Sequence, residues 1–262
     1  MFILKLLLTP LLIVLISLAD RRWGTKVGGV LIGLPLTSAP VSLFVSFDLG
    51  TTFASHMASG VMLGLISQAL FCVTYAWLSY RLNWLGSWLL GWAAFGCSTF
   101  VFEQISVPLP VIFIGIMVCL VLALMVWPQS VEEEVTPQAP AWALPGRMVA
   151  ATGMVLFLTS TASLLGPQLS GLLSPLPIFA TVFAVFAHKL QGGRPARQIL
   201  HGVIISSFAC AVFFLIVAEF IDKWSILATY GAAVVLALLT QALMVWLIRG
   251  IQNTKATKHL PL

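Results

Sequence analysis

Charged residues are scarce in this chain. Only 8% of its 262 residues are Asp, Glu, Lys or Arg, whereas a typical soluble domain carries about 25%. Because so few charges cannot solvate the surface of a folded domain, the composition excludes a water-soluble globular protein. Hydrophobic residues make up 60% of the sequence and the mean hydropathy is +1.06. We therefore expect an all-α polytopic membrane protein.

Other features that the sequence lacks exclude further classes of function. The net charge of +5 is not gathered into a basic cluster, which argues against nucleic acid as a partner. The four cysteines lie inside apolar runs, so we expect packing residues rather than a disulfide framework. No H-E-x-x-H, G-x-S-x-G or closely spaced acidic pair occurs in a span. The sequence thus predicts no metal and no cofactor, and it favours a non-enzyme without deciding the point.

Nine apolar runs approach or exceed the roughly 20 residues that a helix needs to cross a bilayer. They are Phe2–Ala19, Val27–Phe47, Phe53–Tyr80, Trp84–Phe102, Val107–Trp127, Met148–Leu165, Leu169–Ala187, Ile199–Ile221 and Trp224–Ile248. These runs predict four parts of the chain. Residues 1–127 form a first membrane half (spans 1–5), 128–146 an acidic, Pro/Ala-rich cytoplasmic linker, 147–249 a second half (spans 6–9) and 250–262 a basic cytoplasmic tail.

The distribution of Lys and Arg predicts the orientation. If the loop after span 1 is cytoplasmic, eleven of the thirteen basic residues lie inside and only Lys5 and Lys223 lie outside. Because basic residues resist translocation, we expect the N-terminus outside and the C-terminus inside. The alternative for span 1 is a signal peptide cleaved near Ala19, which would not by itself change the orientation of the remaining spans.

Spans 2–3 and 7–8 look alike. Gly33-Leu34, two prolines and Gly60-Val61 in the first pair match Gly171-Leu172, two prolines and Gly202-Val203 in the second. The predicted topology gives the two copies opposite orientations, which is the inverted repeat of many secondary transporters, here with five plus four spans. Coincidental likeness is the alternative, since the chain is rich in Gly, Leu, Phe and Val.

Each copy also places a proline pair near mid-depth, which should interrupt spans 2 and 7. Interrupted helices at matching places predict a solute site, although each pair could instead only kink a packed helix. The predicted site combines the prolines, hydroxyls able to cap the following half-helices, hydroxyls of span 6 and two deep amides. These residues are Pro35, Thr37, Ser38, Pro40, Ser174, Pro175, Pro177, Thr159, Thr161, Gln68 and Gln241. The alternative for the span 6 hydroxyls is helix packing.

No Asp, Glu, Lys or Arg lies at mid-depth in a predicted span, so coupling to an ion gradient has no obvious residue. The candidates nearer the span ends are His56, Glu103, His201 and Glu219, of which His201 also fits a simple interfacial position. Gly29-x-x-x-Gly33 and Gly60-x-x-x-Gly64 predict a close approach of spans 2 and 3.

The hypothesis that joins these features is a small secondary transporter or permease. It would move a small polar or anionic solute across the bacterial inner membrane by alternating access at a site between spans 2 and 7. Its expected partners are the lipid bilayer and the solute, and a homodimer is left open. The 33–40 segment GLPLTSAP and the later PLPIF and FAVFAH segments resemble uncharacterised families of small bacterial membrane proteins, which implies no activity.

Two functions of other classes remain open. A membrane enzyme acting on lipid-linked substrates would bring His56, Glu103, Glu219 and Asp222 together at the outer face. An accessory subunit of a membrane complex would instead present a broad apolar face.

Overall fold

The structure is a computed structural model that describes residues 11, 14–19, 22–35, 38–105, 107–128, 145, 146, 149 and 177–258. This part of the chain is helical without strands. Four helices are long and apolar enough to cross a membrane, namely Thr51–Leu78, Trp84–Glu103, Gly193–Phe220 and the Ile226–Ile248 part of the last helix. The prediction of an all-α protein with helices suited to a membrane is therefore confirmed for the described residues.

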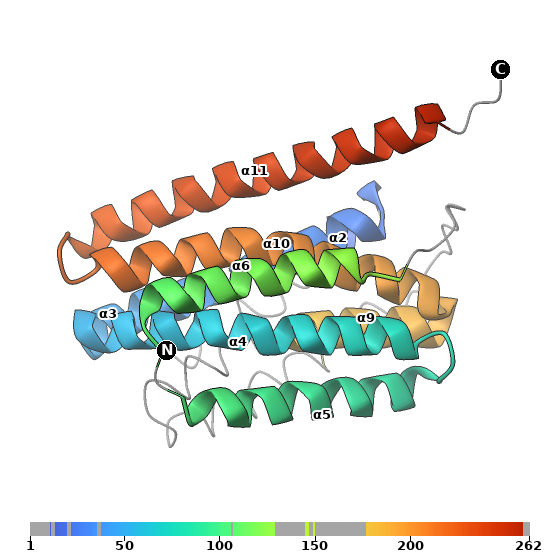
Figure 1. The fold of residues 1–262 in the computed structure, drawn as a ribbon, viewed down its shortest axis with the longest axis horizontal. Coiled ribbons are helices and arrows are strands. Elements are labelled where there is room, and N and C mark those ends of the chain that lie inside the picture. The colour runs from blue at the N-terminus through green and yellow to red at the C-terminus, as the bar shows by residue number, and fades with distance from the viewer. Residues whose placement is uncertain are drawn as a thin grey trace.

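Eight helices carry labels in Figure 1. They are α2 (Thr25–Gly33), α3 (Ser38–Asp48), α4 (Thr51–Leu78), α5 (Trp84–Glu103), α6 (Leu109–Met125), α9 (Ile178–Gln191), α10 (Gly193–Phe220) and α11 (Ile226–Lys258). Predicted spans 3, 4, 8 and 9 correspond to the four long helices. Spans 5 and 7 correspond to the shorter α6 and α9, and span 2 to α2 and α3. Span 6 lies almost entirely outside the described residues, so the nine-span topology stays a prediction.

Local sequence explains where several helices begin. The Asn83 side chain accepts a hydrogen bond from the Gly86 N–H (2.9 Å) and caps α5. Pro108 precedes α6 at its N-cap, where the missing N–H costs nothing. Gly192 alone joins α9 to α10, and its φ of 91° is one that only glycine adopts easily. These short connections force consecutive helices to fold back on each other.

Helix α10 is the centre of the bundle. It packs against α2, α4, α6, α9 and α11, whereas α5 packs mainly on α4 (Figure 1). In its most apolar stretch 72% of the α10 residues are buried, against 17% for α11 and 22% for α5. Because α10 belongs to the predicted second half and α2, α4 and α6 to the first, the two halves pack as one bundle.

The bundle has one basic and one acidic end. Helices α4 and α10 are antiparallel, since Arg197 near the start of α10 bonds to Ser79 after α4, and Ser55 near the start of α4 bonds to Ala218. The basic end therefore carries Arg81, Lys189, Arg194 and Arg197. The acidic end carries Asp48, Glu103, Glu219 and Asp222, together with one lysine, Lys223, which pairs with Glu219. A basic and an acidic end agree with the charge distribution on which the predicted orientation depends, and the orientation itself stays a prediction.

The structure corrects the partner of the first glycine motif. A Cβ added to Gly29 of α2 would lie 2.2 Å from the backbone oxygen of Ile199 in α10, and one added to Gly202 would lie 2.6 Å from the Gly29 carbonyl carbon. Gly29 thus permits the close approach of span 2 to span 8, not to span 3 as predicted. Beside this crossing the Ser206 hydroxyl donates to the Val30 carbonyl oxygen of α2.

The cysteines are free thiols, but they do not all pack in the core. Cys72 and Cys210 are buried and Cys119 is half-buried, as expected of packing residues. Cys97 is exposed on α5, because that helix is covered on one side only.

Candidate functional site

Of the first predicted proline pair, Pro35 lies between α2 and α3, whereas Pro40 lies within the first turn of α3 and does not interrupt it. Helix α2 ends at Gly33, and Leu34 is extended (φ −69°, ψ 153°) because the ring of Pro35 disfavours a helical residue before it. The Pro35 carbonyl oxygen then accepts the Ala39 N–H (2.9 Å) as α3 begins at Ser38, whose side chain is buried. Residues 36 and 37 lie outside the described residues, so the interruption of span 2 stays a prediction.

Helix α9 begins directly after the second predicted proline pair. The Pro177 carbonyl oxygen accepts the Thr181 N–H (2.6 Å), which closes the first turn. The 14 residues of α9 span about 21 Å at 1.5 Å per residue. Because α9 ends at the basic end, its first turn lies inside the bundle, and Pro177 is buried. Ser174 and Pro175 lie outside the described residues, so the interruption of span 7 stays a prediction.

The starts of α3 and α9 approach the middle of the bundle from opposite directions. The 11 residues of α3 span about 16 Å and end at the acidic end, whereas α9 ends at the basic end. Both helices therefore direct the positive ends of their dipoles toward intermediate depth. The start of α3 offers few free N–H groups, because the Ala39 N–H is bonded to Pro35 and Pro40 has none. Helix α2 contacts α9, and both pack on α10.

Polar side chains also meet at mid-depth, where α4 crosses α10. The Gln68 Nε2 of α4 donates to the Ser207 Oγ (3.4 Å), and Ser207 in turn donates to the Val203 carbonyl oxygen (2.8 Å). Ser67 is fully buried and its hydroxyl has no partner. We call Ser67, Gln68, Ser206 and Ser207 the mid-depth polar cluster. It supplies an amide and hydroxyls but no charge.

Gln241 of α11 is the least satisfied predicted site residue in the described part of the chain. Its side chain is 8% exposed, and neither its amide oxygen nor its amide nitrogen has a hydrogen-bond partner. The two predicted amides therefore do not pair with each other, since Gln68 bonds to Ser207. A buried unpaired amide is costly, so Gln241 marks a place where a polar ligand would be stabilising.

The remaining predicted site residues are not placed by side chain. Pro40 belongs to α3 without a described side chain, and Thr37, Thr159 and Thr161 lie outside the described residues. Their part in the site stays a prediction.

The four coupling candidates occupy ordinary surface and interface positions. His56 and Glu103 are exposed, and Glu219 is exposed and pairs with Lys223 on its own helix. His201 is half-buried with its ring 5.3 Å from that of Trp127. Within the described ranges no group of three or more His, Cys, Asp or Glu residues is arranged to hold a metal ion.

Sequence reasoning missed one polar contact between α3 and α11. The Tyr230 hydroxyl lies 2.7 Å from the Ser42 Oγ and 2.9 Å from the Ser46 Oγ, and all three side chains are buried. The i, i+4 spacing of the two serines was the only available signal, and it does not indicate which helix carries the partner. This contact fixes α3 against α11 on the acidic side of the interruption.

Replacing Tyr230 with phenylalanine should lower the free energy of unfolding by about 1–2 kcal/mol, since two interhelical hydrogen bonds are lost and each contributes about 0.6 kcal/mol, at most about 1.7. The measurement is unfolding in mixed micelles with a rising fraction of denaturing detergent. Thr240→Val is the control, because Thr240 is half-buried and its hydroxyl bonds only to Leu236 of its own helix. Equal stability of the two variants would contradict the interhelical role.

Comparison of the chain with family models, curated proteins and solved structures finds no match in any of the three.

Proposed function

We propose that this chain is a small secondary transporter whose solute binds at mid-depth between the starts of α3 and α9. The observation that carries the proposal is that both helices begin inside the bundle, α3 three residues after Pro35 and α9 directly after Pro177, and run to opposite ends. Broken helices that direct their N-terminal dipoles at a midplane solute are a recurrent transporter device. The same arrangement is consistent with nine spans, an inverted repeat and an N-outside, C-inside orientation in a bacterial inner membrane.

The chemistry of the surroundings limits the solute. Free N–H groups at a helix start attract anions and hydrogen-bond acceptors. The mid-depth polar cluster and Gln241 add hydroxyls and amides, and no described acidic residue lies away from the acidic end. The site therefore suits a small polar or anionic solute and disfavours a cation.

Mass spectrometry of small molecules that copurify with the intact protein tests this proposal. We expect wild type to retain a small polar or anionic compound, and a Thr37→Val, Ser38→Ala double variant to lose it, because the cap hydroxyls of α3 are removed. Ser98→Ala is the control, since Ser98 bonds within α5 only. The identified compound should also exchange across proteoliposomes that contain wild type. Retention by the double variant, or absence of exchange, would contradict the proposal.

A further inference from the structure

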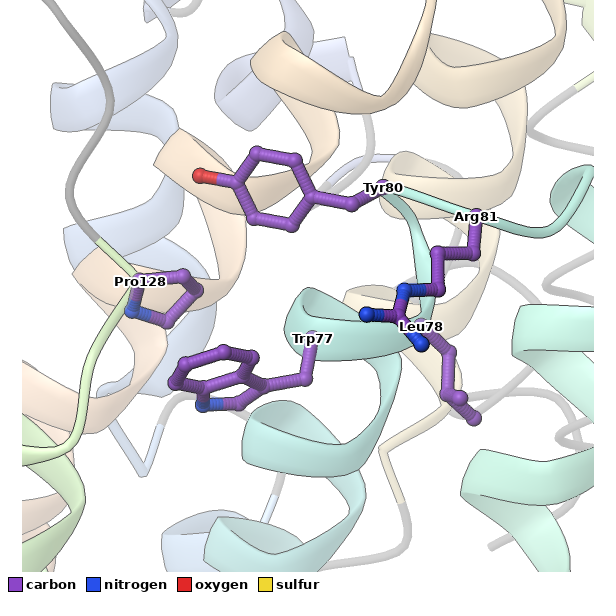
Figure 2. Close-up of a pocket in the computed structure, with 5 residues that line it drawn as sticks. All are labelled: Trp77, Leu78, Tyr80, Arg81 and Pro128. Carbon is purple, nitrogen blue, oxygen red and sulfur yellow. The ribbon is translucent and has the colours of Figure 1, made fainter.

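An open pocket lies at the basic end between the end of α4 and the segment after α6. Its volume is about 590 Å³ and it is lined by Trp77, Leu78, Tyr80, Arg81 and Pro128. Figure 2 shows the Arg81 guanidinium and the Trp77 and Tyr80 rings around one space, with Pro128 on the far side. The Trp77 indole N–H donates to the Val126 carbonyl oxygen (3.1 Å), which ties the end of α4 to the end of α6 and fixes this wall.

One arginine lines the pocket, and a second lies against the Tyr80 ring. Arg81 is exposed at its rim. Arg197 is 7% exposed, donates to the Ser79 Oγ (3.0 Å) and lies 3.9 Å from the centroid of the Tyr80 ring. The described acidic residues are all at the opposite end of the bundle. The Arg81 guanidinium at the rim can bind an anion, and Arg197 holds the Tyr80 wall by a cation–π contact.

An exposed apolar face of α6 continues from the pocket toward the middle of the bundle. Val118, Leu122 and Met125 recur at helical spacing and are 52%, 52% and 77% exposed. Met125 directly precedes Val126, whose carbonyl oxygen accepts the hydrogen bond from the pocket residue Trp77. The charge of Arg81, the rings of Trp77 and Tyr80, and the apolar face of α6 match in chemistry the phosphate, the glycerol region and the acyl chains of a phospholipid.

We propose that this pocket binds the phosphate-bearing headgroup of an anionic phospholipid in the leaflet at the basic end. The Arg81 guanidinium contacts the phosphate, Trp77 and Tyr80 flank the glycerol region, and the acyl chains lie along Val118, Leu122 and Met125 of α6. Basic pockets between spanning helices are suited to such headgroups. The site is separate from the mid-depth solute site and does not depend on it.

Native mass spectrometry of the purified full chain tests the site by titration with phosphatidylglycerol or with phosphatidylcholine of the same acyl chains. We expect wild type to bind phosphatidylglycerol in preference. Arg81→Gln should weaken that binding about fivefold, the value expected for one surface cation, whereas Arg81→Lys should retain most of it. Lys189→Gln is the matched control, because Lys189 lies at the same end over the Trp84 ring and outside the pocket.

Three results would overturn the proposal. Equal binding of the two lipids would remove the role of charge. An equal loss of phosphatidylglycerol binding in Lys189→Gln would indicate that the lipid is attracted to the whole basic end rather than bound in the pocket. Binding of inorganic phosphate alone that Arg81→Gln abolishes, without preference for the anionic lipid, would identify the occupant as a free phosphate anion.

Discussion

Replacing Gly29 with leucine should abolish the stable packing of α2 on α10. The first added carbon already lies 2.2 Å from the Ile199 backbone oxygen and 2.9 Å from the Ile199 Cα, and backbone atoms in a helix cannot move aside as a flexible side chain can. Overpacking commonly costs about 1–3 kcal/mol. Here the helices must separate, which also breaks the bond from Ser206 to Val30. We expect a loss of about 3 kcal/mol or more.

The measurement is the fraction of protein that remains monodisperse after heating in mild detergent. Gly115→Leu is the matched control, because a Cβ at Gly115 of α6 meets nothing within 4 Å. Gly202→Leu should behave as Gly29→Leu does, since it clashes with the same crossing from the other side. If Gly29→Leu were as stable as Gly115→Leu, the close approach of α2 and α10 would be wrong.

Replacing Gln241 with leucine should stabilise the protein and weaken solute retention together. Both amide atoms of Gln241 are buried without a hydrogen-bond partner, and each unpaired buried group costs roughly 1–3 kcal/mol. Leucine has a similar size and no polar atoms, so we expect unfolding to become harder by about 1–3 kcal/mol. If the Gln241 amide instead had a structural hydrogen-bond partner, the leucine variant would be less stable than wild type.

Solute retention is measured as for the proposed function, by mass spectrometry of compounds that copurify. If Gln241 contacts the solute, the leucine variant should retain much less of it while melting at a higher temperature. Thr240→Val is the control for both measurements, because Thr240 is half-buried and its hydroxyl bonds within α11. Lower stability of Gln241→Leu would show that the amide has a structural partner, and unchanged retention would remove Gln241 from the site.

The proline sites show how much of the candidate site sequence reasoning could reach. Proline acts on its own backbone and on the residue before it, so the extended Leu34 and the helix starts at Ser38 and Ile178 follow from local chemistry. The position of a residue along a predicted span could also be estimated from the sequence, because it is found by counting residues from the end of the span. Gln68 and Gln241 are buried, as expected of amides that face the bundle interior, while their depth in a membrane stays a prediction.

The helices that pack against each other could not be predicted from the sequence in the same way. A spanning helix is apolar all round, so its sequence carries little amphipathic signal to indicate which face is buried. Gly29 was therefore assigned to the wrong partner helix, and the contact of Tyr230 with Ser42 and Ser46 was missed. The cation–π contact of Arg197 with Tyr80 was missed for the same reason.

The sequence by itself determined that the chain is helical and apolar enough for a membrane, and it determined the alternation of basic and acidic ends. These properties depend on composition, local backbone chemistry and position along the chain. Only the tertiary structure decided that α10 is the central helix, that α2 crosses it at Gly29 and Gly202, and that Gln241 is left without a partner. Such contacts depend on close packing between segments far apart in the chain, which hydrophobicity alone does not specify.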